Sequence, residues 1–341
     1  MNLKELSQHL GLSQTTVSRA LNGFPEVGER TRRRVLAAAE QFHYRPNSVA
    51  RKLATGRAGA IGIVLSSNRN LLLDPIFMDF LAGLAAASAQ TDTDVLVSAT
   101  HGDEAGTYQR LARARSVDAV VLSTPSIEDP RVGLLHRLGL PVVVHGRTTS
   151  AEPCAFLDID NEGAFHRATE MLIELGHRRI GLVNGDTAYT FALHRQRGWR
   201  AALAGRGLPA ADELDCRGPM TEEDGHRFAR RLLTLPQPPT ALLCSSIFLA
   251  LGAMRAIRDL GLAIGRDVSI VAHDDGLSAI RPETLTPPLT TTFSSIRAAG
   301  GRIAEIAMAI ADGADPASLR EVWAVDIVAR GSTMPVGGSR Q

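Results

Sequence analysis

Apolar residues recur at helical spacing near the start of the chain. Leu3, Leu6 and Leu10 fall on one face of a first short helix, and Val17 and Leu21 share one face of a second. Most of the polar residues around Val17 and Leu21 fall on other faces of the second helix. The spacing predicts two short amphipathic helices that pack face to face.

The segment between these helices favours a tight turn. Gly11 can adopt the backbone conformation that such a connector needs, and Ser13 is a good N-cap because its hydroxyl accepts a hydrogen bond from an unpaired backbone N–H group. The two helices and their connector therefore form a helix-turn-helix pattern. A third helix is expected from about Gly28 to Phe42, and its inner face would carry Val35, Leu36, Ala39 and Phe42.

From Ala58 onwards the pattern changes to short, continuous apolar runs. Such runs are typical of strands that are buried on both faces of a parallel sheet. Helical spacing returns between them, at Phe77–Ala89, Gly163–Leu175 and Leu249–Leu260. The predicted strands contain Ala60–Leu65, Val95–Val97, Ala119–Leu122, Val142–Val144, Ile180–Val183, Ala241–Cys244 and Val268–Val271.

The alternation of strand and helix predicts a doubly wound parallel sheet. About seven such units over roughly 270 residues fit two lobes better than one. Ligands of these folds bind beyond the carboxyl ends of the strands. The fold class predicted from the residues is an all-α helix-turn-helix head followed by an α/β core.

Charge is distributed unevenly along the chain. Residues 1–57 contain ten Lys and Arg residues and four Glu residues, a net charge of +6, whereas the whole chain carries +1. A basic head on a mildly acidic body is typical of a nucleic-acid-binding module that is joined to another domain. Arg30, Arg32, Arg33 and Arg34 could also be one solvated helix face, but beside the helix-turn-helix pattern we favour DNA binding.

Composition and motifs exclude several classes of protein. The 44% hydrophobic and 21% charged residues are ordinary for a globular protein, and no apolar run reaches the ~20 residues that span a bilayer. The start lacks the apolar core of a secretory signal, and three dispersed cysteines form neither a disulfide framework nor a CxxC metal site. The sequence contains no GxxxxGK[ST], HExxH or GxSxG motif. We therefore expect a cytoplasmic protein that is not an enzyme and has no metal site or cofactor.

The second helix carries short polar side chains and one arginine. From a helix in the major groove, such side chains can reach base edges and phosphates. The candidate DNA contacts are Ser13, Gln14, Thr15, Thr16, Ser18, Arg19 and Asn22.

A short segment at 47–54 also has helical spacing, but it is too short to be stable alone. It would order only when DNA or a partner chain is present. Leu53 is apolar among basic residues, which suits a wedge that enters a minor groove; the alternative is a plain linker.

Together these features resemble the LacI/GalR family of bacterial transcription regulators. The resemblance covers nearly the whole chain and rests first on Leu12–Asn22 and Tyr44–Asn47. Further matches follow in the family's order and spacing, at Asp160–Gly163, Leu175–Ile180, Arg195–Trp199, Leu251–Met254, Val268–Val271, Asp274–Asp275 and Pro288–Thr291.

The resemblance implies a three-part organisation. Residues 1–46 would form the helix-turn-helix domain, 47–57 a hinge helix, and 58–341 a core of two lobes like those of periplasmic sugar-binding proteins. Several crossings would join the lobes, so each lobe is discontinuous in sequence. The implied lobes are about 58–157 with 289–318, and about 158–288 with 319–332.

The resemblance also implies a homodimer that reads a near-palindromic operator. Its residue roles fall into three groups. The major-groove readers would be Gln14, Thr15 and Arg19. The residues that position the backbone would be Thr16, Ser18 and Asn22. The minor-groove residues would be Asn47, Ala50 and Leu53, with Leu53 kinking the operator centre.

Two charged residues are the main candidates for contact with a small ligand. Arg195 matches the family's ligand-anchoring arginine, and its planar fork suits hydroxyls or carboxylates, although it could be a surface arginine. Asp274 follows a predicted strand, where its carboxylate could accept sugar hydroxyls or cap the next helix. The other candidates are Arg147, Asp158 or Asp160, Ser246, and Phe77, which could stack on a ligand or pack in the core.

One stretch departs from the family pattern. Ser245–Phe248 stands where members commonly carry an Asn–Asp pair, so Ser246 keeps a hydroxyl and Ile247 removes a carboxylate. The resemblance implies a regulator, most simply a repressor, whose operator affinity is controlled by a ligand between the lobes. A sugar is the first choice of ligand, and a purine or a sugar acid is the second. Inducer and corepressor both remain open.

Two rival functions fit parts of the pattern. The same two lobes could belong to a sugar-transport protein or a sugar-acting enzyme. A ligand-independent architectural protein could use the core only to dimerise.

Overall fold

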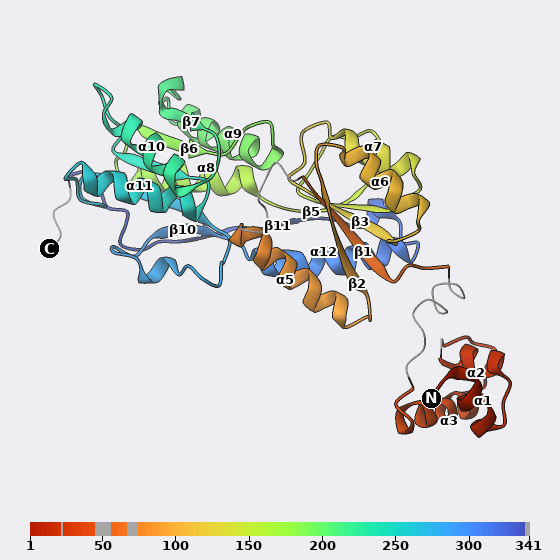
Figure 1. The fold of residues 1–341 in the computed structure, drawn as a ribbon. Coiled ribbons are helices and arrows are strands. Elements are labelled where there is room, and N and C mark those ends of the chain that lie inside the picture. Colours follow the sequence, from red (N-terminus) through yellow and green to blue (C-terminus); the bar gives the residue numbers. More distant parts are fainter. Residues whose placement is uncertain (22, 45–55, 67–73, 338–341) are drawn as a thin grey trace. The chain divides into compact units, whose positions relative to one another are not determined.

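A computed structural model describes residues 1–21, 23–44, 56–66 and 74–337. The chain divides into two compact units, Met1–Gly59 and Ala60–Gln341 (Figure 1). Residues 47–55 of the expected hinge helix lie outside the described residues.

The first unit contains the helices α1 (Leu3–Leu10), α2 (Gln14–Leu21) and α3 (Glu29–Gln41). A capping box begins α1, because Asn2 Oδ1 accepts the Glu5 N–H at 3.0 Å while Glu5 Oε2 accepts the Asn2 N–H at 2.9 Å. Gly11 ends α1 with a φ of 64°, a left-handed conformation that favours glycine. The predicted helix-turn-helix pattern is confirmed.

The core of the first unit is formed by one apolar face of each helix. Leu6, Val17 and Val35 are fully buried there. Leu36 was expected on this inner face, but it is 47% exposed, and Ala38 is buried instead. Successive helical residues differ by about 100° around the axis, so the residue after Val35 leaves the face and the residue three positions on returns to it.

The second unit has two six-stranded sheets, each of which defines one lobe. The sheet of the first lobe has the order β11-β5-β4-β3-β1-β2, and its pairs are parallel. Its central strands are rich in buried Val, Ile and Leu, as expected of strands covered on both faces. The strands are β1 (Ala60–Ser66), β2 (Asp94–Thr100), β3 (Ala119–Ser123), β4 (Val142–His145), β5 (Ala155–Ile159) and β11 (Arg320–Trp323).

The sheet of the second lobe has the order β12-β10-β9-β8-β6-β7. It is parallel except at its edge, where β12 runs antiparallel to β10. The strands are β6 (Ile180–Asn184), β7 (Asp215–Arg217), β8 (Ala241–Cys244), β9 (Ser269–Asp274), β10 (Thr290–Phe293) and β12 (Asp326–Val328). The predicted fold class, a helical head with two parallel α/β lobes, is confirmed.

Helices flank both sheets (Figure 1). None of those in the described residues is long and apolar enough to cross a membrane. The first lobe carries α5 (Pro75–Ala89), α6 (Glu104–Arg113), α7 (Pro130–Arg137) and α12 (Ile296–Ala311). The second lobe carries α8 (Asn161–Glu174), α9 (Thr190–Gly205), α10 (Glu222–Leu233) and α11 (Ile247–Asp259). Short 3₁₀ turns are η2 (Asp212–Leu214), η3 (Pro282–Thr284) and η4 (Pro316–Ser318).

The chain crosses between the lobes after β5, after β10 and after β11. The first crossing agrees with the expected one to within a few residues, but the others lie about five residues later than expected. The segment 290–293 was assigned to the first lobe, yet β10 pairs with β9 in the second. The segment 320–323 was assigned to the second lobe, yet β11 pairs with β5 in the first. Pairing with a neighbouring strand sets these boundaries, and the local sequence does not reveal it.

Glycines allow the main helix pairs to approach closely. A Cβ atom added to Gly83 of α5 would lie 1.9 Å from the Arg297 carbonyl oxygen of α12, and one on Gly300 would lie 2.1 Å from the Phe80 carbonyl oxygen. Gly198 plays the same part between α9 and α8, as does Gly252 between α11 and α10. Helices that are in backbone contact cannot slide past one another, so these pairs make each lobe rigid.

We expect Gly83→Ala to lower the free energy of unfolding by about 1–3 kcal/mol, because α5 and α12 must move apart to admit the new methyl group. Urea unfolding of the full chain measures this loss. Gly301→Ala is the matched control, since its nearest contact would be 3.7 Å away, and it should be neutral or stabilise by up to about 1 kcal/mol. Equal losses for both variants would contradict the close-packing account.

Candidate functional site

The helix α2 presents the predicted DNA-reading side chains. Val17 and Ala20 are buried and fix which face of α2 turns inward. Gln14, Thr15 and Arg19, the expected base readers, are exposed on the opposite side. The structure therefore brings these three side chains to one accessible surface.

Ser13 begins α2 in the way that its sequence predicts. Its Oγ accepts the Thr16 N–H at 3.0 Å and lies 2.8 Å from the Thr16 hydroxyl. The cap fixes the first turn of the helix and holds the Thr16 side chain in place. Thr16 and Ser18, the expected backbone contacts, are partly buried on the flanks of the exposed surface.

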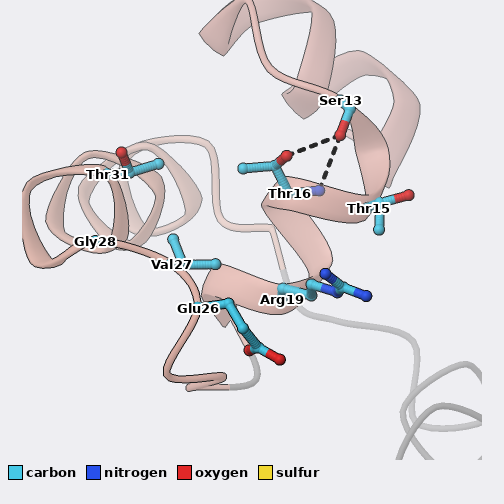
Figure 2. Close-up of a pocket in the computed structure, with 8 residues that line it drawn as sticks. All are labelled: Ser13, Thr15, Thr16, Arg19, Glu26, Val27, Gly28 and Thr31. Carbon is cyan, nitrogen blue, oxygen red and sulfur yellow. Dashed lines mark hydrogen bonds between the residues drawn. The ribbon is translucent and has the colours of Figure 1, made fainter.

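A hollow of about 270 Å³ lies between the start of α2 and the start of α3 (Figure 2). Figure 2 shows the α2 side chains on one side of this hollow and the loop before α3 on the other. The lining is mostly polar and mixes hydroxyls with one cation and one carboxylate. Its residues are Ser13, Thr15, Thr16, Arg19, Glu26, Val27, Gly28 and Thr31.

The arginines of α3 add positive charge to the first unit. Arg30, Arg33 and Arg34 are exposed, as expected. Arg32 is partly buried instead, and its guanidinium donates to the Phe24 carbonyl oxygen at 2.8 Å, which braces the loop before α3. The other predicted DNA contacts, Asn22, Asn47, Ala50 and Leu53, lie outside the described residues.

In the second unit, Arg195 is a buried cation on α9. It is 5% exposed; its Nε donates to Asn161 Oδ1 at 2.7 Å, and its Nη1 donates to the Ser245 carbonyl oxygen. Its guanidinium carbon lies 5.2 Å from the ring centre of Phe165 and 5.3 Å from that of Phe191. The alternative of a surface arginine is excluded.

Burial lowers the pKa of Arg195 to about 10, and the nearby carboxylates of Asp275 and Asp158 oppose that shift. Arg195 nevertheless stays charged at neutral pH. Asp158 belongs to β5 of the first lobe and Asp275 follows β9 of the second, so both lobes supply charge to one cation.

The structure places Asp275, rather than Asp274, in this charged cluster. Burial alone would raise the pKa of Asp275, but His273, Arg195 and His145 hold it below its ordinary value. Asp274 instead accepts the Gly276 N–H at 2.9 Å, and burial raises its pKa. Successive residues at a strand end point to opposite sides, so only one of the pair can face Arg195.

Two histidines complete the cluster, and the sequence did not suggest either. His273 Nε2 lies 3.5 Å from Asp275 Oδ1, while its Nδ1 lies 3.0 Å from the Thr292 hydroxyl. His145, at the end of β4, stacks on Phe80 with ring centres 4.8 Å apart. Burial lowers the pKa of both histidines, and the nearby Asp275 carboxylate opposes that shift.

Arg147 and Asp158 form an ion pair beside the first crossing, with 2.6 Å between Nε and Oδ2. Asp158 also accepts the Asn161 side-chain amide at 3.1 Å, and Asn161 in turn binds Arg195. Of the two alternatives, Asp158 therefore joins the cluster. Asp160 instead caps α8 by accepting the Gly163 N–H at 2.9 Å and pairs with Arg167 on the surface.

Two further candidates have structural roles. Ser246 is buried and caps α11, since its Oγ accepts the Leu249 N–H at 3.2 Å. Phe77 is buried in the hydrophobic core, which is the alternative that the sequence left open. The role of Ser246 could have been recognised in the sequence, because a serine three residues before a helical N–H is a common cap.

The lobes also touch on two sides of this region. Pro125 of the first lobe accepts the Thr190 N–H of α9 at 3.0 Å, and Ser126 forms a bridge with Tyr189. Elsewhere Asp79 of α5 accepts the Ser278 N–H at 3.0 Å and its hydroxyl at 3.2 Å. These contacts hold the lobes together around the charged cluster.

The cluster brings hydrogen-bond donors, acceptors and aromatic rings together. Carboxylates and a guanidinium supply acceptors and donors, and Tyr189 and Phe191 stack with ring centres 6.3 Å apart on the same helix start. Among the described residues, no group of three or more His, Cys, Asp and Glu side chains could hold a metal ion.

Two family profiles match the chain. Residues 2–47 match bacterial regulatory proteins of the lacI family, and residues 58–322 match the periplasmic binding proteins and sugar binding domain of the LacI family. The chain is 48% identical to the HTH-type transcriptional regulator AglR of Rhizobium meliloti (strain 1021), over 98% of this chain and 95% of that protein.

Two solved structures are similar over almost the full length. The lac repressor dimer bound to operator and an anti-inducer has a TM-score of 0.79 at 26% identity, covering 98% of this chain and 99% of that one. A complex of the transcriptional regulator CelR with cellobiose has a TM-score of 0.72 at 27% identity, covering 97% of this chain and 99% of that one.

We expect Ser13→Ala to destabilise the first unit by about 1 kcal/mol, because the Thr16 N–H loses its partner. Hydrogen exchange of the α2 amides in the full chain measures the loss. Ser13→Asp should restore the protection, since aspartate is an equally good cap. Protection that is unchanged in Ser13→Ala would show that the cap does not hold α2.

Proposed function

The chain belongs to the LacI family of bacterial regulatory proteins, and we propose that a neutral sugar bound between its two lobes controls how tightly its first unit grips an operator. It is a DNA-binding transcriptional regulator and not an enzyme. We further propose that it acts in the cytoplasm as a homodimeric repressor. The observation that carries the proposal is Arg195, a buried cation shared by groups from both lobes.

The DNA-binding part of the proposal is supported by the surface of α2. Gln14, Thr15 and Arg19 are the side-chain types that bond to base edges, and all three are exposed on one helix. The exposed arginines of α3 supply charge for phosphates. Two-fold symmetry of a dimer would require a near-palindromic operator.

The ligand part is supported by the charge of the cluster. The carboxylates of Asp158 and Asp275 are matched by the guanidiniums of Arg147 and Arg195, so the cluster offers an anionic sugar acid no unpaired cation. A neutral sugar can donate hydroxyl protons to the carboxylates and place an apolar ring face on Phe191. The similarity to a CelR–cellobiose complex agrees with a sugar. A purine is less well matched by two carboxylates.

The proposed control is a shift between two arrangements of the lobes. A ligand that contacts Asp158 on one lobe and Asp275 on the other binds one arrangement better, and that difference is the free energy available to change DNA affinity. A ligand that favours the DNA-bound arrangement is a corepressor, and one that favours the other is an inducer.

The deciding experiment has two arms. We expect the purified chain to select one near-palindromic sequence from a randomised duplex pool, and neutral sugars to shift its melting temperature and change that binding. A sugar at ~100 times its Kd stabilises the protein by about 2.7 kcal/mol. A chain that retains no sequence from the pool would refute DNA reading, and a response confined to purines or sugar acids would refute the ligand class.

We expect Asp275→Asn to weaken sugar binding by about tenfold or more. The charge-assisted hydrogen bond from the sugar to the carboxylate is lost, and Arg195 loses a nearby counter-charge. Asp274→Asn is the matched control, since this carboxylate bonds to Gly276 and not to Arg195. Titration of the stabilising sugar by calorimetry measures both. A larger loss for Asp274→Asn would restore Asp274 as the contact.

A further inference from the structure

The hollow between α2 and α3 contains one side chain that does not suit a DNA-binding surface. Glu26 lines that hollow together with Arg19, and its carboxylate lies on the side away from the Ser13, Thr16 and Thr31 hydroxyls (Figure 2). We propose that Glu26 is a further sequence-reading residue, which selects a base that presents an amino group in the major groove, cytosine first. This inference rests on the proposed function, because it requires α2 to read DNA.

The Glu26 carboxylate forms no hydrogen bond or ion pair with any residue in the described part of the chain. Its neighbour Glu29 differs, since its oxygens lie 3.6 Å from Arg32 and 3.7 Å from Arg33. The charge of Glu29 is therefore offset within the protein, whereas that of Glu26 remains available to a ligand in the hollow.

The loop that carries Glu26 is firmly held. The next residue, Val27, is buried in the core, and its N–H donates to the Phe24 carbonyl oxygen at 3.2 Å. Phe24 in turn donates its N–H to the Arg19 carbonyl oxygen at 3.0 Å, and Arg32 braces the same turn. The backbone at Glu26 is thus fixed to the end of the reading helix, and a side chain carried on such a backbone can discriminate between bases.

An unpaired carboxylate on this surface weakens binding to every phosphate nearby. The cost is offset only where the carboxylate accepts a hydrogen bond from DNA. In the major groove the donors are the amino groups of cytosine and adenine, and carboxylates pair best with cytosine N4. Guanine and thymine present acceptors at the corresponding edge, so Glu26 would reject them.

The test is selection from a randomised duplex pool with the full-length chain and its variants Glu26→Gln and Glu26→Ala. Glu40→Gln is the matched control. Glu40 is exposed on α3 and lies outside the hollow, and its substitution removes the same charge. Arg19→Ala locates the base pair that Arg19 reads. Affinities for the selected operator and for random duplex are measured at two salt concentrations.

We expect the unaltered chain to require cytosine, or adenine second, at one position in each half-site. Glu26→Ala should lose that preference by about tenfold, the order of one direct base contact, and Glu26→Gln should shift it towards adenine, which glutamine pairs with. Both variants and Glu40→Gln should bind random duplex slightly more tightly. Only the Glu26 variants should change the selected sequence.

Three results would overturn the inference. The Glu26 variants could select the same sequence as the unaltered chain; they could alter only the position that Arg19→Ala identifies, which would make Glu26 a partner of Arg19; or Glu40→Gln could have the same effect. In each case the unaltered chain still selects an operator. A failure of the proposed function is different, since no sequence would then be selected by any variant.

Discussion

A positive charge removed from water where two lobes meet is the constraint on which the second unit depends. Arg195 is buried between two phenyl rings, and an unpaired ion in such a place costs several kcal/mol. Asp275 from its own lobe and Asp158 from the other lobe reduce that cost. Any change in the separation of the lobes therefore changes the electrostatic balance around Arg195, which is what a ligand-controlled regulator requires.

The rest of the second unit makes this coupling effective. Glycines hold the helix pairs of each lobe at backbone contact, so any movement between the lobes would be absorbed at the crossings. Arg167 ties two of these crossings together. Its guanidinium donates to Asp160 at 3.0 Å in the first crossing and to the Val325 carbonyl oxygen at 3.0 Å in the third. Bending at one crossing is thereby transmitted to another.

Most of the framework could be predicted from the sequence, because strands such as β1, β3 and β8 are apolar throughout. The strand β10 was missed because it is Thr290–Phe293, in which threonines are buried and bonded to neighbouring residues. The edge strands β11 and β12 were missed for a related reason, since partial exposure removes the apolar signal. The strand β7 was missed because its three residues, Asp215–Arg217, are too few and too polar to form an apolar run. The lobe boundaries shifted with β10 and β11.

The charged cluster was predicted only in part. Arg195 was identified through the family resemblance. Its partners come from distant segments, and the pattern of residues around Arg195 does not predict which of those segments fold next to it. Asp274 and Asp275 are adjacent, and only the end of β9 decides which of them faces Arg195. Asp160 and Ser246 have side-chain oxygens that could bind a ligand. In the structure both oxygens instead accept a backbone N–H group at the start of a helix.

The carbonyl group of Pro125 links the two lobes in another way. It accepts the first backbone N–H of α9, the helix that holds Arg195. The start of α9 has no side-chain cap, and the opposite lobe supplies the hydrogen-bond acceptor instead. Separation of the lobes would leave that N–H group unpaired until water replaced the carbonyl oxygen. Partial separation would lose the bond without gaining hydration, which disfavours intermediate positions. This hydrogen bond therefore favours the closed contact of the two lobes over partly separated positions.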